Sequence, residues 1–117
     1  MHELSIATNI IEIAEAEAHK HGSHSIRTIK LRLGEFTTIV REALQFSFEV
    51  ACHGTLAEHA TLEIETVPLA AWCVKCGPVE QPAHEICLVC PVCGSSLEIV
   101  SGEELQVEYI ELDGLRG

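Results

Sequence analysis

Two pairs of cysteines most constrain what this chain can fold into. They follow the pattern Cys73-x2-Cys76-x13-Cys90-x2-Cys93, which gives two chelating pairs joined by a loop. Four thiolates at this spacing are typical of a tetrahedral zinc site. Each pair is followed by glycine, which lets the backbone turn tightly around a metal. We therefore predict a structural zinc(II) site in a zinc ribbon, with these four cysteines as its ligands.

Two further cysteines need another explanation. Cys87-x2-Cys90 is also a possible chelating pair, but only the choice of Cys90 and Cys93 places glycine after both pairs. Cys87 is then a spare thiol or an alternate ligand. Cys52 lies in an apolar helical segment, where a buried small hydrophobe is expected. A catalytic zinc would keep one coordination position for water, so a site filled by four cysteines predicts that the protein is not an enzyme.

The charge balance excludes several classes of partner. The 117 residues include 18 acidic residues against seven lysines and arginines, a formal net charge of −11. Phosphate backbones and anionic lipid surfaces are poor partners for such a chain, so we expect no nucleic-acid and no membrane binding. Neither an apolar run of roughly 20 residues nor an export signal is found, which predicts a cytoplasmic protein whose cysteines bind metal rather than form disulfides.

Hydrophobic periodicity predicts the elements outside the cysteine-rich segment. In the first helix, Ile6, Ile10 and Ile13 belong to the apolar side and Gly22 is the stop signal. In the last strand, Leu105, Val107 and Tyr109 alternate with polar residues. We expect helices at 4–21 and 41–52, and strands at 29–33, 62–65 and 105–109.

These elements predict an α+β fold, a small three-stranded sheet with two helices plus an inserted zinc-ribbon module with four cysteine ligands. The periodicity breaks off after Pro68 and resumes near residue 103. We therefore expect a discontinuous main domain at 1–68 and 103–117, and a zinc-binding domain at 69–102. A monomer or a weak homodimer is compatible with a chain of this size.

The first three residues, Met1-His2-Glu3, form a second candidate metal site. A histidine in second position can chelate a metal with its imidazole, its own amide nitrogen and the terminal amine. A further donor from the backbone or side chain of Glu3 would complete a square-planar set, which suits Ni(II) or Cu(II). His2 is too bulky to favour removal of the initiator methionine, so the amine is expected to stay in register.

Taken together, several motifs resemble the HypA/HybF family of nickel metallochaperones of [NiFe]-hydrogenase maturation. They are Met1-His2-Glu3, Gly34-Glu35, Glu42-Ala43-Leu44 with Phe46 and Phe48, and the Cys73–Cys93 zinc pattern, in this order. The resemblance covers essentially the whole chain. It implies a nickel-binding α/β domain, a separate zinc domain, and His2 as the essential Ni(II) ligand, assisted by the Met1 amine and by Glu3.

The resemblance also implies partners. At one position, however, this sequence departs from the family pattern. Family members pass transported Ni(II) to the hydrogenase large subunit together with a nickel-insertion GTPase, and some also serve urease. Some members have an acidic residue a few positions after Gly-Glu that assists nickel, whereas this sequence has Val40 and Arg41. Glu35 and Glu42 are nearby candidates, with capping or solvated carboxylates as the alternative. His84, inside the zinc module, is a further candidate transfer ligand.

Two other functions stay open at this level. The chain could be a zinc-ribbon module for protein interaction without nickel transfer, in which Met1-His2-Glu3 has no role. It could also be a zinc hydrolase, which would require a ligand set other than four thiolates. Nickel delivery is the interpretation that we favour, with weak and accessible nitrogen donors on the terminus for transfer to a partner.

Overall fold

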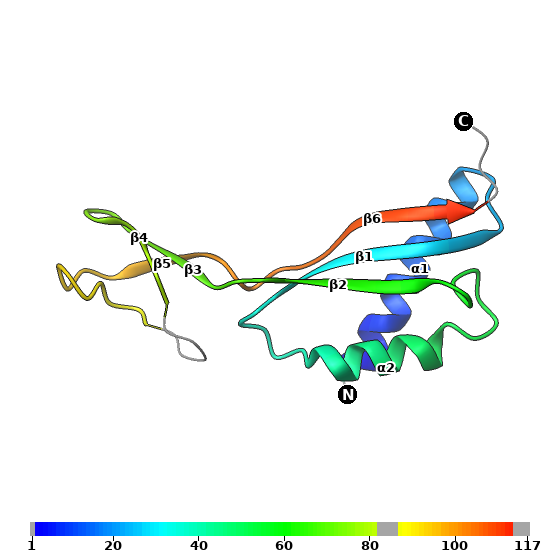
Figure 1. Ribbon diagram of the computed structural model, residues 1–117, viewed down its shortest axis with the longest axis horizontal. Helices are drawn as coiled ribbons and strands as arrows, with labels where there is room; N and C mark the ends of the chain where they lie inside the picture. The colour runs from blue at the N-terminus through cyan, green and yellow to red at the C-terminus, as the bar shows by residue number, and fades with distance from the viewer. Residues whose placement is uncertain (1, 82–86, 114–117) are drawn as a thin grey trace. The chain divides into compact units, whose positions relative to one another are not determined.

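The structure is a computed structural model that describes residues 2–81 and 87–113 (Figure 1). Within these residues, two helices and six strands follow one another. Their bounds are α1 His2–Lys20, β1 Ser25–Gly34, α2 Arg41–Ala51, β2 Thr61–Val67, β3 Ala70–Cys73, β4 Gly77–Val79, β5 Leu97–Ser101 and β6 Leu105–Asp113. The predicted α+β fold, with two helices, a three-stranded sheet and an inserted module that carries the four cysteines, is confirmed, and the structure shows that this module contains a small sheet of its own.

The chain divides into two compact units, and each is described by itself. Of the described residues, unit 1 contains 2–32, 38–65 and 105–113. Unit 2 contains 33–37, 66–81 and 87–104. Neither described helix is both long enough and apolar enough to cross a membrane.

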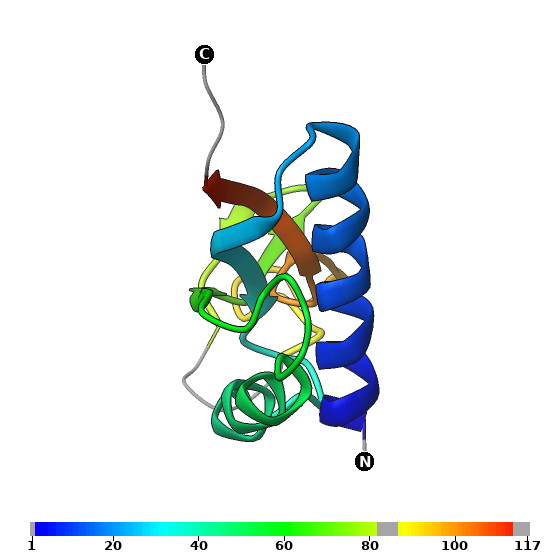
Figure 2. The same ribbon diagram turned by 90° about the vertical axis from the view of Figure 1, so that its right-hand side faces the viewer.

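Unit 1 is a mixed sheet in the order β2-β1-β6 with helices against one face. Figure 1 shows β1 and β2 running in the same direction, connected through α2, while β6 runs the opposite way. In Figure 2 the axes of α1 and α2 cross rather than run side by side. Such a parallel pair requires a crossover connection, and α2 provides it.

The core of unit 1 is aliphatic, as a composition with few aromatic residues requires. Small side chains on α1, Ala7, Ala14 and Ala18, are fully buried and allow the helix to pack closely. Opposite them the alternating apolar residues of β1 and β2 are buried, as the strand pattern predicts. Phe48 of α2 is the largest fully buried side chain, and burying it contributes about 1.5–3 kcal/mol.

The structure corrects two details of the predicted core. Ile13, expected on the apolar side of the first helix, has 52% of its surface exposed. In β6 the half-buried residues are Val107, Ile110 and Leu112, whereas Tyr109 is exposed, so the alternation changes phase within the strand. The predicted pattern of Leu105, Val107 and Tyr109 therefore does not describe one buried face.

Unit 2 is built around the short strand β3, which pairs antiparallel with both β4 and β5. Cys73, the last residue of β3, lies opposite Gly77 of β4 and Leu97 of β5. The first metal-binding turn is therefore the hairpin turn between β3 and β4. The second lies just before β5, so the sheet brings both turns to the same end.

Two chain segments approach each other closely in unit 2, at Gly34 and Gly102. A Cβ atom added at Gly34 would lie 2.2 Å from the carbonyl oxygen of Gly102. The backbone also bonds across this contact, because the Gly34 N–H donates to Glu104 and the Phe36 N–H donates to Gly102, both at 2.7 Å. Only glycine fits here, which explains the Gly-Glu motif at this turn.

Candidate metal centre

Four cysteine side chains converge in unit 2. Cys73 lies at the end of β3 and Cys76 in the following turn, while Cys90 and Cys93 lie in the turn before β5. Their sulfur atoms all lie within 4.8 Å of one another. Among the described residues this is the one cluster of histidine, cysteine or carboxylate groups with metal-binding geometry.

The geometry of the cluster fits a tetrahedral zinc(II) ion. With Zn–S bonds of about 2.3 Å, two sulfur atoms on a tetrahedron lie about 3.8 Å apart. The Sγ atoms of Cys73 and Cys93 are 3.5 Å apart, and the whole set lies within reach of one ion. Cys73 and Cys90 are buried and Cys76 and Cys93 exposed, so the site lies at the surface of a small module. Bound zinc would hold together a unit that has little hydrophobic core of its own.

Glycines shape both turns of the zinc site. Gly77 and Gly94 follow the two cysteine pairs and have φ angles of 85° and 76°, in the left-handed region that favours glycine. The Gly94 N–H donates to the Cys90 carbonyl oxygen at 2.9 Å, and the Cys90 N–H donates to Ser95 at 2.7 Å. These bonds close the second turn around the sulfur atoms.

The thiols of the cluster differ in pKa. Hydrogen bonds from the side chain and backbone of Ser95 lower the pKa of Cys93 to about 6. Backbone hydrogen bonds, first from Cys93, lower the pKa of Cys90. In contrast, a hydrogen bond with Cys93 raises the pKa of Cys76 to about 12. At neutral pH the metal-free cluster therefore holds a thiolate at Cys93 and a thiol at Cys76, and zinc must displace the Cys76 proton.

The two remaining cysteines lie outside the cluster. Cys87 directs its Sγ to the carbonyl oxygen of Val89 at 3.0 Å, and its N–H donates to the Gln81 side chain at 2.6 Å. The structure thus places Cys90 and Cys93, rather than Cys87, with the first pair. Cys52 is buried at the end of α2, where burial raises the pKa of its thiol. It packs as a small hydrophobic residue, as expected.

The N-terminal candidate site lies at the start of α1. Met1 is outside the described residues, and His2 is the first residue of the helix. The Glu3 carboxylate accepts a hydrogen bond from the Val40 N–H at 3.2 Å. Val40 is the N-cap residue of α2 and has no side-chain cap of its own, so Glu3 supplies a negative charge at that helix start. This tertiary contact could not be read from local sequence.

The structure also shows the contacts or exposure of other residues that the sequence suggested as nickel ligands. The Glu35 carboxylate accepts the Leu69 N–H at 3.3 Å, a contact within unit 2 between two segments far apart in sequence. Glu42 is exposed in the first turn of α2. Arg41, which this sequence has in place of an acidic residue a few positions after Gly34-Glu35, donates to the Ile64 carbonyl oxygen at 3.1 Å. His84 lies outside the described residues.

Comparison with known proteins identifies the family. Residues 1–112 match HypA, described as the metallochaperone of hydrogenase/urease nickel incorporation. The hydrogenase maturation factor HypA of Acidithiobacillus ferrooxidans is 39% identical over 114 residues, covering 97% of this chain and all of that protein. HypA of a Roseiflexus species is 43% identical over 114 residues, covering 97% of this chain and 93% of that protein.

Further relatives and solved structures agree with this assignment. The hydrogenase maturation factor HybF of Escherichia coli is 35% identical and covers 97% of this chain and all of that protein. The solution structure of the Ni metallochaperone HypA from Helicobacter pylori has the same fold, with a TM-score of 0.67 at 24% identity over 94% of this chain and 96% of that one. A second HypA solution structure has a TM-score of 0.72 at 25% identity over 96% of each chain. This chain belongs to the HypA/HybF family of nickel metallochaperones for hydrogenase and urease maturation, whose role is metal delivery rather than catalysis.

Proposed function

We propose that the protein binds Ni(II) at its N-terminus and delivers it to the large subunit of a [NiFe]-hydrogenase during maturation. The ligands in this proposal are the Met1 amine, the amide and imidazole nitrogens of His2, and a donor from Glu3. The observation that carries it is that α1 begins at His2. The first four N–H groups of a helix have no intrahelical acceptor, so nickel can replace the amide proton of His2 without breaking a helical hydrogen bond.

The contact of Glu3 bears on which of its atoms would bind nickel. The His2 amide nitrogen is joined by chelate rings to the terminal amine and to the imidazole. These two donors fill both positions beside it in a square plane and leave no place for the Glu3 amide nitrogen. We therefore propose a carboxylate oxygen of Glu3 as the fourth donor, on the carboxylate that also accepts the Val40 N–H. The carboxylate then holds the terminus against the start of α2. Three nitrogens in adjoining rings together with one carboxylate oxygen suit a square-planar metal such as Ni(II).

The same position weakens the proposed site in a way that suits delivery. A helix N-terminus carries a partial positive charge, which disfavours a cation by about 0.3–1 kcal/mol. A terminal chelate is also open to solvent exchange and to attack by ligands of a recipient. In the proposed division of labour, residues 1–68 and 103–117 bind nickel for transfer, and residues 69–102 hold structural zinc.

The proposed partners are a nickel-insertion GTPase and the hydrogenase large subunit, with urease as a second recipient. Membership of a hydrogenase and urease maturation family supports this. A cytoplasmic location belongs to the same proposal, because a zinc site of four thiolates needs a reducing compartment. Purified complexes with the GTPase and with the large subunit, resolved by size-exclusion chromatography, test the partner assignments one by one.

Calorimetric titration of Ni(II) into zinc-loaded protein tests the nickel site. Protein with an authentic Met1 is compared with a version that has a Gly-Ser extension before Met1, and with His2→Gln. Both changes are expected to abolish binding, while His53→Gln, at an exposed histidine elsewhere in unit 1, leaves it intact. Equal binding by the native and extended proteins would place nickel elsewhere and refute the N-terminal site.

A further inference from the structure

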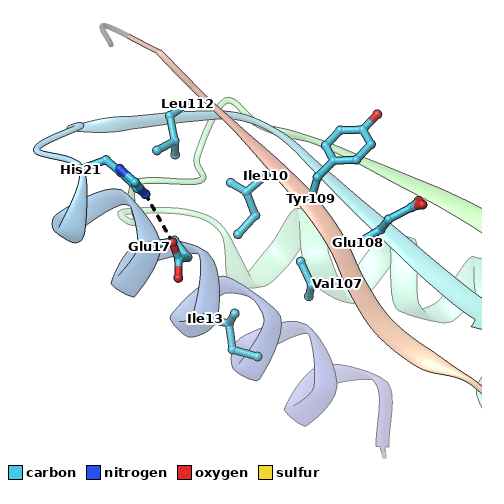
Figure 3. Close-up of a pocket in the computed structure, with 8 residues that line it drawn as sticks. All are labelled: Ile13, Glu17, His21, Val107, Glu108, Tyr109, Ile110 and Leu112. Carbon is cyan, nitrogen blue, oxygen red and sulfur yellow. Dashed lines mark ion pairs between the residues drawn. The ribbon is translucent and has the colours of Figure 1, made fainter. Parts of the chain in front are cut away.

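An apolar groove runs between α1 and β6 in unit 1, and no proposed nickel or zinc ligand lines it. It has a volume of about 440 Å³, and Ile13, Val107, Ile110 and Leu112 supply its apolar lining. In Figure 3, Val107 and Ile110 point from the strand towards the helix, whereas Tyr109 points away from it. Ile13 is 52% exposed, so the apolar surface that it contributes to the groove is only partly covered.

The groove lies along the free edge of the sheet. β6 is at one end of the strand order β2-β1-β6, and no other described strand pairs with its outer edge. Its outward N–H and C=O groups can therefore pair with one more strand. That strand would lie over α1, and its inward side chains would cover Ile13 and fill the groove. An edge strand with pockets for alternate side chains is the arrangement used in recognition by β-strand addition.

The charges on β6 indicate what kind of strand would fit. The strand carries Glu108, Glu111 and Asp113 and contains no lysine or arginine. Asp113 pairs with Arg27 at 3.7 Å, whereas Glu108 and Glu111 form no ion pair within the described part of the chain. A second copy of this chain would bring the same acidic residues together across the new pair, and like charges opposite each other are destabilising. Lysine and arginine would be stabilising there.

We propose that the outer edge of β6 is a docking site for an extended, basic segment of a partner protein. The segment adds a fourth strand to the sheet, buries alternate apolar residues over Ile13 and Ile110, and places lysine or arginine against Glu108 and Glu111. The docking site contains none of the proposed nickel ligands. The docking proposal can therefore fail while the nickel proposal holds, and the reverse.

Three fluorescein-labelled, capped nonapeptides test the proposal by anisotropy. The first alternates valine and lysine, the second alternates valine and glutamate, and the third is the first with N-methyl groups at the positions that would pair. The valine-lysine peptide is expected to bind and to shift the amide NMR signals of β6. The other two are expected to bind about tenfold more weakly, because charge pairs and ladder hydrogen bonds are lost.

Charge exchange on the protein makes the test specific. The double variant Glu108→Lys with Glu111→Lys should reverse the preference and bind the valine-glutamate peptide. The control Glu49→Lys with Glu63→Lys changes the net charge equally at exposed positions off this edge and should retain the original preference.

Two results would overturn the proposal. In the first, the peptide preference is unchanged in the Glu108 and Glu111 variant, or the NMR shifts fall outside β6 and α1. In the second, sedimentation shows a concentration-dependent dimer of the wild-type protein that Ile13→Glu abolishes, which would assign the groove to a second copy of the chain.

Discussion

Replacing Gly34 by alanine should destabilise unit 2 through a clash between backbone segments. The new Cβ would lie 2.2 Å from the Gly102 carbonyl oxygen, 2.3 Å from its carbon and 2.5 Å from the Glu103 nitrogen. These are backbone atoms of a second segment, so no side chain can rotate away. The two segments must separate, which also strains the hydrogen bonds from Gly34 to Glu104 and from Phe36 to Gly102.

The expected magnitude follows from these contacts. Overpacking costs about 1–3 kcal/mol. Weakening two backbone hydrogen bonds costs about 1 kcal/mol each. Alanine regains about 0.4–1 kcal/mol by restricting the unfolded chain. The free energy of unfolding should therefore fall by about 2–5 kcal/mol, a large part of the roughly 5–15 kcal/mol typical of a domain.

Gly54→Ala is the matched control, because it isolates backbone strain from the clash. Gly54 has a φ of 76°, but nothing lies within 4 Å of an added Cβ. The left-handed conformation costs alanine about 1–2 kcal/mol, partly offset by the same unfolded-state gain. The expected loss is about 1 kcal/mol.

Urea unfolding of the zinc-loaded protein measures both effects. The single tryptophan, Trp72, lies in β3 and reports on unit 2, and far-UV circular dichroism reports on the helices of unit 1. Gly34→Ala should shift the Trp72 transition by more than Gly54→Ala shifts the helical one. If Gly34→Ala is as stable as the wild type, the close approach is wrong and the reasoning fails.

Three further predictions concern the metal centre and its surroundings. Cys87→Ser should bind one zinc per chain as the wild type does, whereas Cys90→Ser should lose it. Atomic absorption after dialysis measures this, and zinc loss in both variants would contradict the assignment. Zinc affinity should fall as the pH drops and should fall more steeply below about 6. Zinc displaces the Cys76 proton throughout this range, and below the lowered pKa of Cys93 it must displace a Cys93 proton as well. Competition with a chromophoric chelator between about pH 5 and 8 measures this, and a flat profile would refute it. Glu35→Ala should destabilise unit 2 by about 1–3 kcal/mol through the lost bond to Leu69 and leave nickel affinity unchanged, and calorimetry showing weaker nickel binding would instead make Glu35 a ligand.

Local patterns predicted the elements because helices and strands leave different periods in a chain that buries one face. The helix over residues 4–21 is observed as α1, and Gly22 ends it with a φ of 70°. The alternation of Ile29, Leu31 and Leu33 predicted a strand whose apolar residues are buried in β1. The exposure of Ile13 and Tyr109 was not predicted by this periodicity. Whether an apolar residue is covered depends on how far the neighbouring element extends, and β6 is the last strand of its sheet.

By itself, the sequence determined the chemistry of the zinc centre and the order of the elements outside the cysteine-rich segment, whereas β3, β4 and β5 within it were not predicted. Thiolates at chelating spacing, each pair followed by glycine, allow few other sites. Only the tertiary structure decided what the carboxylates do. Glu3 bonds to Val40 across 37 positions and Glu35 bonds to Leu69 across 34. No local pattern encodes such contacts, because they arise where distant segments meet during packing. The acidic free edge at β6 has the same origin, since neighbours in a sheet are set by topology rather than by spacing along the chain.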